Sequence, residues 1–557
     1  MDFVNNFSNE KLKSAYKKAF WVISMLAVVL FCTVSYLFYR TWLNNGNPGV
    51  YKSFFTLGLV SIILALIYTR KDVFSHLKPL KLFLFPVLTA LGLVFIFIGF
   101  VNARGVTMDY EIRLAFVLAF ISILIITSIL LFAGKLNLKT VIYFIIVLGM
   151  ALRIGYTIYT PYTIRQHDVD FNYGHLAYMK YLADNNSLPD NEAGQMYHPP
   201  LHHALSAVVY KTGLSIGFNQ DTSVRMIQFF MVFLSSLSLF VVYKLLKLIK
   251  NNPVFVMPGV LLFSFHPYNI YLSSYLNNDG TMMLFYILAI YYLIKWYTEN
   301  TMRNILLTAV FTSCAIITKK SGYILLPLIF SVFLLELLRH KNEIKKYCAQ
   351  YISFAAVMIP LPLTFFLRSA LVFHHSFSYL PIPGLPRMGN EFVNLISFNI
   401  KRILFNPFPG YAFEVNEANR YFLEYTFKSS LFGEWDFARM YNPARVLVVS
   451  ALLIYLAAIV YLFFMEKKDL FQYGFIFIIN ALIPFILFTK LRIDSPFVCS
   501  QNFRYLLPML LSLSFFIGQV TQGLSKTRFK MAGNALLFSV ISVFSIFSTI
   551  FILGIGL

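Results

Sequence analysis

Two aspartates that follow a long apolar segment are the residues best suited to acid and base chemistry. Asp168 and Asp170 are two positions apart, next to His167, and come soon after an apolar run that ends near residue 159. An aspartate can accept the proton of a hydroxyl group while a second group orients or tunes it. We therefore expect a general base here, and favour Asp168 over Asp170 because it is nearer to the apolar run. A solvated loop that caps a helix would contain the same residues.

A tyrosine and three histidines form a second polar segment further along the chain, at Tyr197, His198, His202 and His203. His198 and His202 are four positions apart, but no carboxylate stands at the Glu-x-x-His spacing of a metal site. We expect no metal or other cofactor, and a divalent cation bound by these histidines is the alternative. His167, Tyr197, His198 and His202 are expected to contact the substrate.

Three cations occupy unusual places. Arg153 falls inside an expected membrane span, where a charge is costly and indicates a functional residue with a partner such as Asp168 or Asp279. A structural ion pair is the alternative. Lys319 and Lys320 fall at an outer membrane boundary, where positive charge is uncommon, so we expect them to bind phosphate. A loop missed in the assignment of spans is the alternative explanation.

The composition is that of a membrane protein. Of 557 residues, 58% are hydrophobic and 13% are charged, whereas soluble domains carry roughly 25% charged residues. The formal net charge of +22 lies mostly in short loops between apolar runs, which indicates membrane topology and not nucleic-acid binding. The cysteines show no C-x-x-C pair, so we expect neither a disulfide nor structural zinc; they are Cys32, Cys314, Cys348 and Cys499.

Apolar runs of about 18 to 22 residues, each long enough to cross a bilayer, recur along the whole chain. They predict an all-α integral membrane protein with about fifteen transmembrane helices. The expected spans are 19–40, 53–69, 80–101, 112–133, 140–159, 225–243, 254–273, 281–297, 303–318, 322–338, 349–370, 443–464, 471–489, 503–522 and 532–556.

The positive-inside rule orients these spans with the N-terminus in the cytoplasm, because every second loop is short and basic. Two long loops, 160–224 and 371–442, then lie outside. In the first, apolar residues at helical spacing within 174–184 and 201–208 predict amphipathic helices on the membrane surface. Counting the second of these helices as a span would put the basic segment 244–250 outside, against the rule.

The chain divides into two expected parts. Residues 1–139 form a four-helix membrane module without a chemical constellation, and residues 140–557 form the core that carries the polar motifs. In the second outer loop, Glu434, Trp435 and Asp436 could line an acceptor site or belong to a solvated lid.

The order of the polar motifs resembles that of the C-type polytopic glycosyltransferases (GT-C), which include protein O-mannosyltransferases and aminoarabinose transferases. The resemblance covers about residues 140–525. It rests on an Asp-containing loop after a core span, a surface helix and Pro-Pro-Leu at 199–201, His266-Pro267, Asn277-Asn278-Asp279, Lys319-Lys320-Ser-Gly322, and Gln501 to Pro508 with Arg504-Tyr505. Many relatives have adjacent Asp-Glu where this chain has Asp168-Val-Asp170, and the four leading spans also depart from the usual arrangement.

The resemblance implies an inverting membrane glycosyltransferase. Asp168 or Asp170 would deprotonate an acceptor hydroxyl, and a polyprenyl phosphate would leave toward fixed cations. The donor phosphate would be bound by Arg504, Lys320, Arg153 and Lys319, and further substrate contacts would come from Asn278, Asp279, Gln501 and Tyr505.

The expected partners are a polyprenyl-phosphate sugar donor, membrane lipids, and a cell-envelope acceptor such as a polysaccharide, teichoic acid, glycolipid or protein. We expect a bacterial plasma-membrane protein with its active site on the extracytoplasmic face. A transporter or flippase for lipid-linked or anionic substrates is the alternative function, although no inverted repeat is evident in the sequence.

Overall fold

The computed structural model describes residues 138–554, except 377–378, 380–385, 411–413, 438–439 and 528–529. Within these ranges the chain is helical, and only an isolated bridge between Arg387 and Phe497 pairs extended segments. The expected module 1–139 and its four spans lie outside the described residues, apart from the last two positions.

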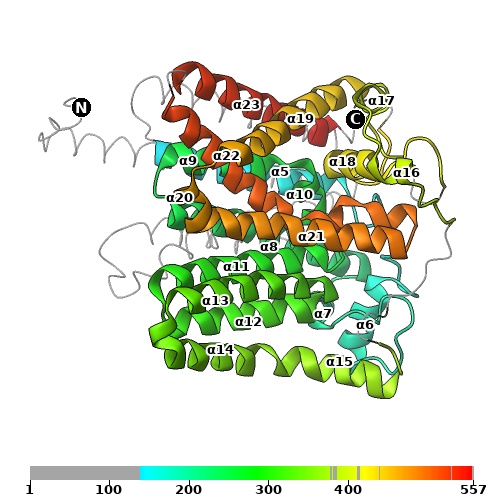
Figure 1. Cartoon of the computed structure of the whole chain (residues 1–557). Coiled ribbons are helices and arrows are strands. Elements are labelled where there is room, and N and C mark those ends of the chain that lie inside the picture. The colour runs from blue at the N-terminus through cyan, green and yellow to red at the C-terminus, as the bar shows by residue number, and fades with distance from the viewer. Residues whose placement is uncertain are drawn as a thin grey trace, which may run out of the picture.

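The first half of the described chain contains ten α-helices and short 3-10 turns (Figure 1). They are α5 (Leu138–Tyr159), α6 (His175–Asn185), α7 (Leu201–Ser215), α8 (Gln220–Ile249), α9 (Pro253–Phe265), α10 (Pro267–Tyr271), η2 (Leu272–Ser274), α11 (Asp279–Glu299), α12 (Met302–Thr318), η3 (Lys320–Ile324), α13 (Leu325–Arg339), η4 (Lys341–Glu343) and α14 (Ile344–Met358).

The second half continues the bundle. It contains α15 (Pro360–Val372), α16 (Phe392–Ile396), α17 (Ile400–Phe405), α18 (Phe422–Phe432), α19 (Tyr441–Phe464), α20 (Lys467–Asp469), the π-turn η6 (Leu470–Gly474), α21 (Phe475–Asp494), η7 (Val498–Gln501), η8 (Phe503–Leu506), α22 (Met509–Ser525) and α23 (Lys530–Gly554).

Seven helices of the described part are long and apolar enough to cross a membrane, or up to nine if each of two bent pairs is one span. The expected count of fifteen is therefore not confirmed. The expected span 254–273 is one difference, because α9 has only 13 residues and ends at Phe265. His266 adopts an extended backbone, which suits the residue before Pro267, and the chain then turns into α10.

Both bent pairs contain a proline at or near the break. Helices α14 and α15 meet at 48°, and Pro360 is the first residue of α15. Residues 498–506 meet α22 at 48°, and Pro508 directly precedes Met509, the first residue of α22. Proline cannot donate the backbone hydrogen bond that would continue a preceding helix. The second break leaves the segment that carries Arg504 as short 3-10 turns at the end of a span.

Small residues allow α9 and α22 to pack closely. A Cβ atom added at Gly259 would lie 2.5 Å from the carbonyl oxygen of Ser514, and one added at Gly518 would lie 2.6 Å from that of Phe255. Close contact of backbones through small residues is a common way of joining helices in membranes. This pair therefore anchors the segment before α22 to the core.

The two helices expected in the first long loop are present as α6 and α7. They pack against the N-terminal part of α8, around Leu176, Met179, Ala207 and Ile227. Neither helix is among the candidate spans. In Figure 1 they lie toward the same end of the bundle as α16 and α18.

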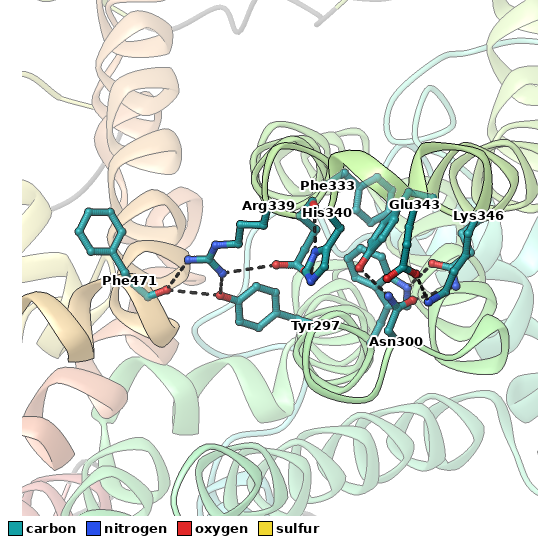
Figure 2. Close-up of polar contacts among 12 residues, drawn as sticks. Tyr297, Asn300, Phe333, Arg339, His340, Glu343, Lys346 and Phe471 are labelled. Atoms are coloured by element: carbon teal, nitrogen blue, oxygen red, sulfur yellow. Dashed lines mark hydrogen bonds and ion pairs between the residues drawn. The ribbon is translucent and has the colours of Figure 1, made fainter.

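At the opposite end of the bundle, a polar network joins α11, α13 and the turn η6 that precedes α21 (Figure 2). Arg339 donates to the hydroxyl of Tyr297 and, at 3.1 Å, to the carbonyl oxygen of Phe471. Nearby, Trp296 donates to Gln350, which donates to Asn300, both at 2.9 Å. These contacts hold the helices together at this end of the bundle.

Candidate functional site

Segments that are far apart in the sequence form one polar pocket that opens to solvent. It is bordered by the loop after α5, the turn before α11, the segment after α18 and the segment before α22. Its lining residues are Gln166, His167, Tyr268, Tyr275, Asn277, Gly433, Glu434, Asn502 and Arg504.

The loop that carries the two aspartates has a strained but well-bonded backbone. Arg165 and Asp168 adopt left-handed conformations with φ of 57° and 55°. The carbonyl oxygen of Asp168 accepts a hydrogen bond from the backbone N–H of His175, at 2.6 Å, which ties the loop to the start of α6. Side chains other than glycine are uncommon in this conformation, and such strain is often found at functional sites.

The carboxylates of Asp168 and Asp170 have different surroundings. Oδ1 of Asp170 accepts hydrogen bonds from the backbone N–H groups of Asn172 and Tyr173, both at 2.8 Å. Partial burial alone would raise the pKa of Asp170, but these N–H groups outweigh it and the pKa is lowered. Asp168 is exposed, and its carboxylate makes no hydrogen bond within the described part of the chain. Asp170 thus holds the loop, whereas Asp168 is available to a substrate.

A buried carboxylate, Glu434, is part of the pocket lining. Its Oε2 lies 3.0 Å from Nε2 of His167, and its Oε1 accepts a hydrogen bond from Nδ2 of Asn502 at 2.7 Å. The ring of His167 also stacks on Trp435, with 4.6 Å between centroids. Burial would raise the pKa of Glu434, but the contact with His167 and the charge of Arg504 outweigh burial, so the pKa is lowered. The group is therefore an ionised carboxylate at neutral pH.

Arg504 supplies positive charge to the same pocket. The side chain of Asn502 accepts from the backbone N–H of Arg504 at 2.8 Å and so caps the turn that carries it. One terminal nitrogen of Arg504 donates to the hydroxyl of Tyr505 at 3.1 Å, while Nε is buried and makes no hydrogen bond in the described structure. A buried guanidinium with a donor to spare is suited to an oxyanion.

The adjacent Lys319 and Lys320 differ in their partners. Lys319 forms an ion pair with the buried carboxylate of Asp279, with 2.5 Å between Nζ and Oδ1. Nζ of Lys320 donates instead to the carbonyl oxygen of Tyr379 at 3.2 Å and lies over the rings of Tyr197 and Tyr379, at 5.6 and 5.8 Å. Lys319 is thus neutralised by its partner, whereas the charge of Lys320 has no carboxylate within ion-pair distance among the described residues.

Tyr197 lies close to several of the expected site residues. Burial raises its pKa, and the charges of Arg504, Asp168 and Asp279 all act on it. Its ring packs on that of His198, with 4.1 Å between centroids, and Nζ of Lys320 lies 5.6 Å from its centre. The structure thus brings residues from two of the sequence motifs together at Tyr197.

The histidines form a stacked group. His175 and His203 are joined by a 2.9 Å hydrogen bond between ring nitrogens, and the rings of His175 and His198 stack with 5.6 Å between centroids. Burial holds the pKa of each of these three well below its ordinary value and lowers that of His202 to about 4. In the ranges that the structure describes, no three His, Cys, Asp or Glu side chains are arranged to bind a metal ion.

Several expected substrate contacts are occupied by the protein itself. Both ring nitrogens of His202 are hydrogen-bonded, to Thr281 at 2.9 Å and to the carbonyl oxygen of Leu276 at 3.1 Å. Nδ2 of Asn278 donates to the carbonyl oxygen of Thr318 at 3.2 Å. These contacts hold the start of α11 in place, and both side chains are buried outside the pocket lining.

Gln501 and Arg153 are also bound internally. Oε1 of Gln501 accepts from Arg492 at 3.2 Å, and its amide donates to the carbonyl oxygen of Asn419. Arg153 donates to Ser235 at 2.9 Å and to the carbonyl oxygen of Ser264 at 2.8 Å. The expected pairing of Arg153 with Asp168 or Asp279 is wrong, because this guanidinium lies fully buried among α5, α8 and α9 and is bonded to neutral groups.

Other pocket residues were not identified as site residues from the sequence. Asn277 and Asn502 fall within motifs that were noted, but neighbours were chosen instead. Gln166 is positioned by two bonds to the backbone of residues 274 and 276, at 2.9 Å each. Nothing in the sequence distinguished Tyr268 and Tyr275 from other aromatic residues, which are abundant throughout this chain.

Comparison with known proteins identifies one family. Residues 197–365 match the model of the family described as dolichyl-phosphate-mannose-protein mannosyltransferase. This match confirms the resemblance to the C-type glycosyltransferases. It includes Tyr197, Asp279, Lys319 and Lys320 but ends before Glu434 and Arg504. No curated protein matches the chain.

Proposed function

We propose that this protein, a membrane glycosyltransferase of the C type, transfers a sugar from a polyprenyl-phosphate donor to a hydroxyl group of a cell-envelope acceptor. The observation that carries the proposal is an unbonded carboxylate that adjoins, in the chain, a pocket whose lining contains an unsatisfied cation. Asp168 follows directly on His167, which lines the pocket, and Arg504 lines the same pocket with its Nε unbonded.

In the proposed reaction, the carboxylate of Asp168 removes the proton of the acceptor hydroxyl. The oxygen attacks the anomeric carbon from the side opposite the phosphate. The bond between that carbon and the phosphate oxygen breaks, and its electron pair remains on the polyprenyl phosphate. A displacement of this kind inverts the configuration of the sugar.

The phosphate gains negative charge as it leaves, so cations placed there stabilise the transition state more than the ground state. Arg504 and Lys320 fit this role better than Lys319, which is paired with the carboxylate of Asp279. They also fit better than Arg153, which is fully buried among α5, α8 and α9 and bonded there, whereas Arg504 lines the pocket. The guanidinium of Arg504 can bind two phosphate oxygens at once.

The remaining pocket residues suit a sugar. The amide N–H groups of Asn277 and the hydroxyl of Tyr275 retain donors, and Tyr268 and Tyr275 offer aromatic rings. Such groups can form hydrogen bonds with vicinal hydroxyls while rings cover the apolar face of the sugar.

The distribution of charge supports an extracytoplasmic active site. The end opposite the pocket carries Arg339, Lys341, Lys345 and Lys346 within one turn region, as the positive-inside rule requires of a cytoplasmic end. A lipid-linked donor fits this orientation, because it is available outside the cytoplasm.

The test is sugar transfer in proteoliposomes, using a panel of polyprenyl-monophosphate sugars and a cell-envelope extract as acceptor. The native chain is compared with Asp168→Asn and with Asp184→Asn, an exposed carboxylate on α6 that pairs with Lys180. A chelator is added in a parallel reaction. Transfer that is lost in Asp168→Asn, retained in Asp184→Asn and insensitive to the chelator would support the proposal.

Two results would contradict it. A native chain that transfers no sugar from any donor but moves a labelled lipid between leaflets would favour a transporter. Normal transfer by Asp168→Asn would remove this residue from the mechanism.

A further inference from the structure

Glu434 joins three segments that come from distant parts of the sequence. It follows α18, its Oε2 contacts His167 in the loop after α5, and its Oε1 contacts Asn502 in the segment before α22. The residue is 8% exposed. A buried carboxylate is costly unless its partners satisfy it, so these contacts are tightly constrained.

Each partner of Glu434 is directly connected to a residue with a proposed chemical role. His167 precedes Asp168 in the chain. Asn502 uses its side-chain oxygen to accept from the backbone N–H of Arg504 and from the hydroxyl of Tyr268, both at 2.8 Å. Glu434 therefore lies on a continuous path of polar contacts from the loop of the proposed base to the turn of the proposed phosphate-binding cation.

We propose that Glu434 is a positioning residue that sets the separation between Asp168 and Arg504. This inference rests on the proposed glycosyl transfer. It assigns Glu434 no contact with the reacting atoms.

The chemistry of the two contacts makes a carboxylate necessary at this position. The amide of Asn502 donates to Oε1, since its own oxygen is already used twice, and the charge of Oε2 attracts the imidazole of His167 at an ion-pair distance of 3.0 Å. A carboxylate serves both contacts, one oxygen each. A glutamine carries no charge, so Glu434→Gln can keep the bond from Asn502 but loses the attraction to His167.

The ring of Trp435 provides a spectroscopic signal for this arrangement. It stacks on His167 at 4.6 Å, and its Nε1 donates to the hydroxyl of Tyr275 at 3.4 Å. Displacement of His167 would change the surroundings of the indole and hence its fluorescence. The difference between each variant and the same variant carrying Trp435→Phe isolates this signal from the other tryptophans.

The experiment compares the native chain with Glu434→Gln, Glu434→Asp and the matched control Glu424→Gln in the proteoliposome assay. Glu424 is a buried carboxylate on α18 that pairs with Arg402 at 2.6 Å, away from the pocket lining. We expect kcat to fall about 30-fold in Glu434→Gln, since small misplacements of reacting groups cost up to ~100-fold. Glu434→Asp should be intermediate, KM for the donor should change less than ~3-fold by the same argument, and the Trp435 emission should shift.

The control should retain the native kcat in the fraction of protein that is folded. If Glu434→Gln does not fold, Asn502→Ala is used in its place. This substitution removes the hydrogen bond between Asn502 and Glu434 and should give the same loss of kcat. An active native chain with unchanged kcat in Glu434→Gln would overturn this inference alone. A native chain without transferase activity would overturn the proposed function, and this inference with it.

Discussion

The two ends of α11 carry polar clusters of opposite character. The helix has 21 residues, which places its ends about 30 Å apart. At its C-terminal end, Trp296, Gln350, Asn300 and Tyr347 form a chain of hydrogen bonds in which each side chain is satisfied by the next. Near its N-terminal end lie the pocket, the exposed Asp168 and the unbonded Nε of Arg504.

This difference separates polar residues that stabilise the fold from polar residues that are suited to bind a ligand. Buried polar groups that satisfy one another stabilise the packing of helices and need no ligand. Groups that are positioned by the protein, yet retain a free donor or acceptor, are suited to bind something else. Substitutions matched between the two ends should therefore affect stability at one end and activity at the other.

The largest effect is expected from Asp168→Asn. Loss of the proposed base should lower kcat by about 1000-fold, within the range for general-base catalysis. The thermal midpoint should stay unchanged, because the exposed carboxylate makes no hydrogen bond in the described chain. Sugar transfer and thermal unfolding are measured on the same preparation, and a fall in both would make Asp168 structural.

Arg504→Lys should follow, with a loss of about 100-fold in kcat because a lysine cannot provide the two parallel donors of a guanidinium. Arg339→Lys is the matched substitution at the opposite end, where Arg339 donates to Tyr297 and Phe471. It should leave kcat unchanged. Equal losses in the two variants would show that the comparison between the ends does not hold.

Lys319→Met tests whether a cation that is already paired contributes to stability, as the hydrogen-bonded residues at the C-terminal end of α11 do. It would leave the carboxylate of Asp279, whose side chain is 2% exposed, without its partner. Removal of one member of a buried pair costs about 3 kcal/mol of unfolding free energy. Chemical denaturation of Lys319→Met and of the double variant with Asp279→Asn measures the unfolding free energy. The double variant should regain most of the stability that Lys319→Met loses.

Glu336→Gln should have a smaller effect on stability and none on kcat. The carboxylate of Glu336 is buried and lies 3.4 Å from Arg339 and 3.6 Å from His340. Loss of its charge should cost about 1 kcal/mol, since both partners are partly exposed. Thermal unfolding and transfer rates test this, and a change in kcat would indicate coupling between the two ends.

The smallest effect concerns pH. The pKa of Asp170 is lowered in the folded protein, so its contribution to stability is fully present above its unfolded pKa of about 3.9 and is lost as the pH falls through the folded value. The difference in thermal midpoint between the native chain and Asp170→Asn should be constant from pH 5 to 8 and shrink at lower pH. A difference that instead changed between pH 6 and 8 would point to another group.

The sequence allowed the helical class, the family resemblance and the main polar segments to be predicted, because these depend on apolar periodicity and on motif order. It allowed the two helices of the first long loop to be predicted as well, since Leu176, Met179 and Ala183 recur on one face. The number of spans was less accessible, because short apolar helices such as α9 have the composition of a span without its length.

The pairing of side chains could not be obtained from the sequence. Lys319 and Lys320 are equivalent by position, and only the fold directs Lys319 to Asp279 and Lys320 to two tyrosine rings. Glu434 likewise lies far from His167 in the chain, so no spacing could connect them. The choice of Asp168 over Asp170 as the base stays a prediction, and the bonding of Asp170 within its own loop supports it.

The close contact at Gly174 has a consequence for motion. A Cβ atom there would lie 2.4 Å from the backbone nitrogen of Asp170 and 2.6 Å from the carbonyl oxygen of Asp168. The loop of the aspartates is therefore in direct backbone contact with the residue that precedes α6, and a swing of the loop away from α6 would also break the bond from His175 to Asp168. If a bulky acceptor has to enter, a shared displacement of the loop and α6 would preserve these contacts, on the microsecond to millisecond timescale of collective motions.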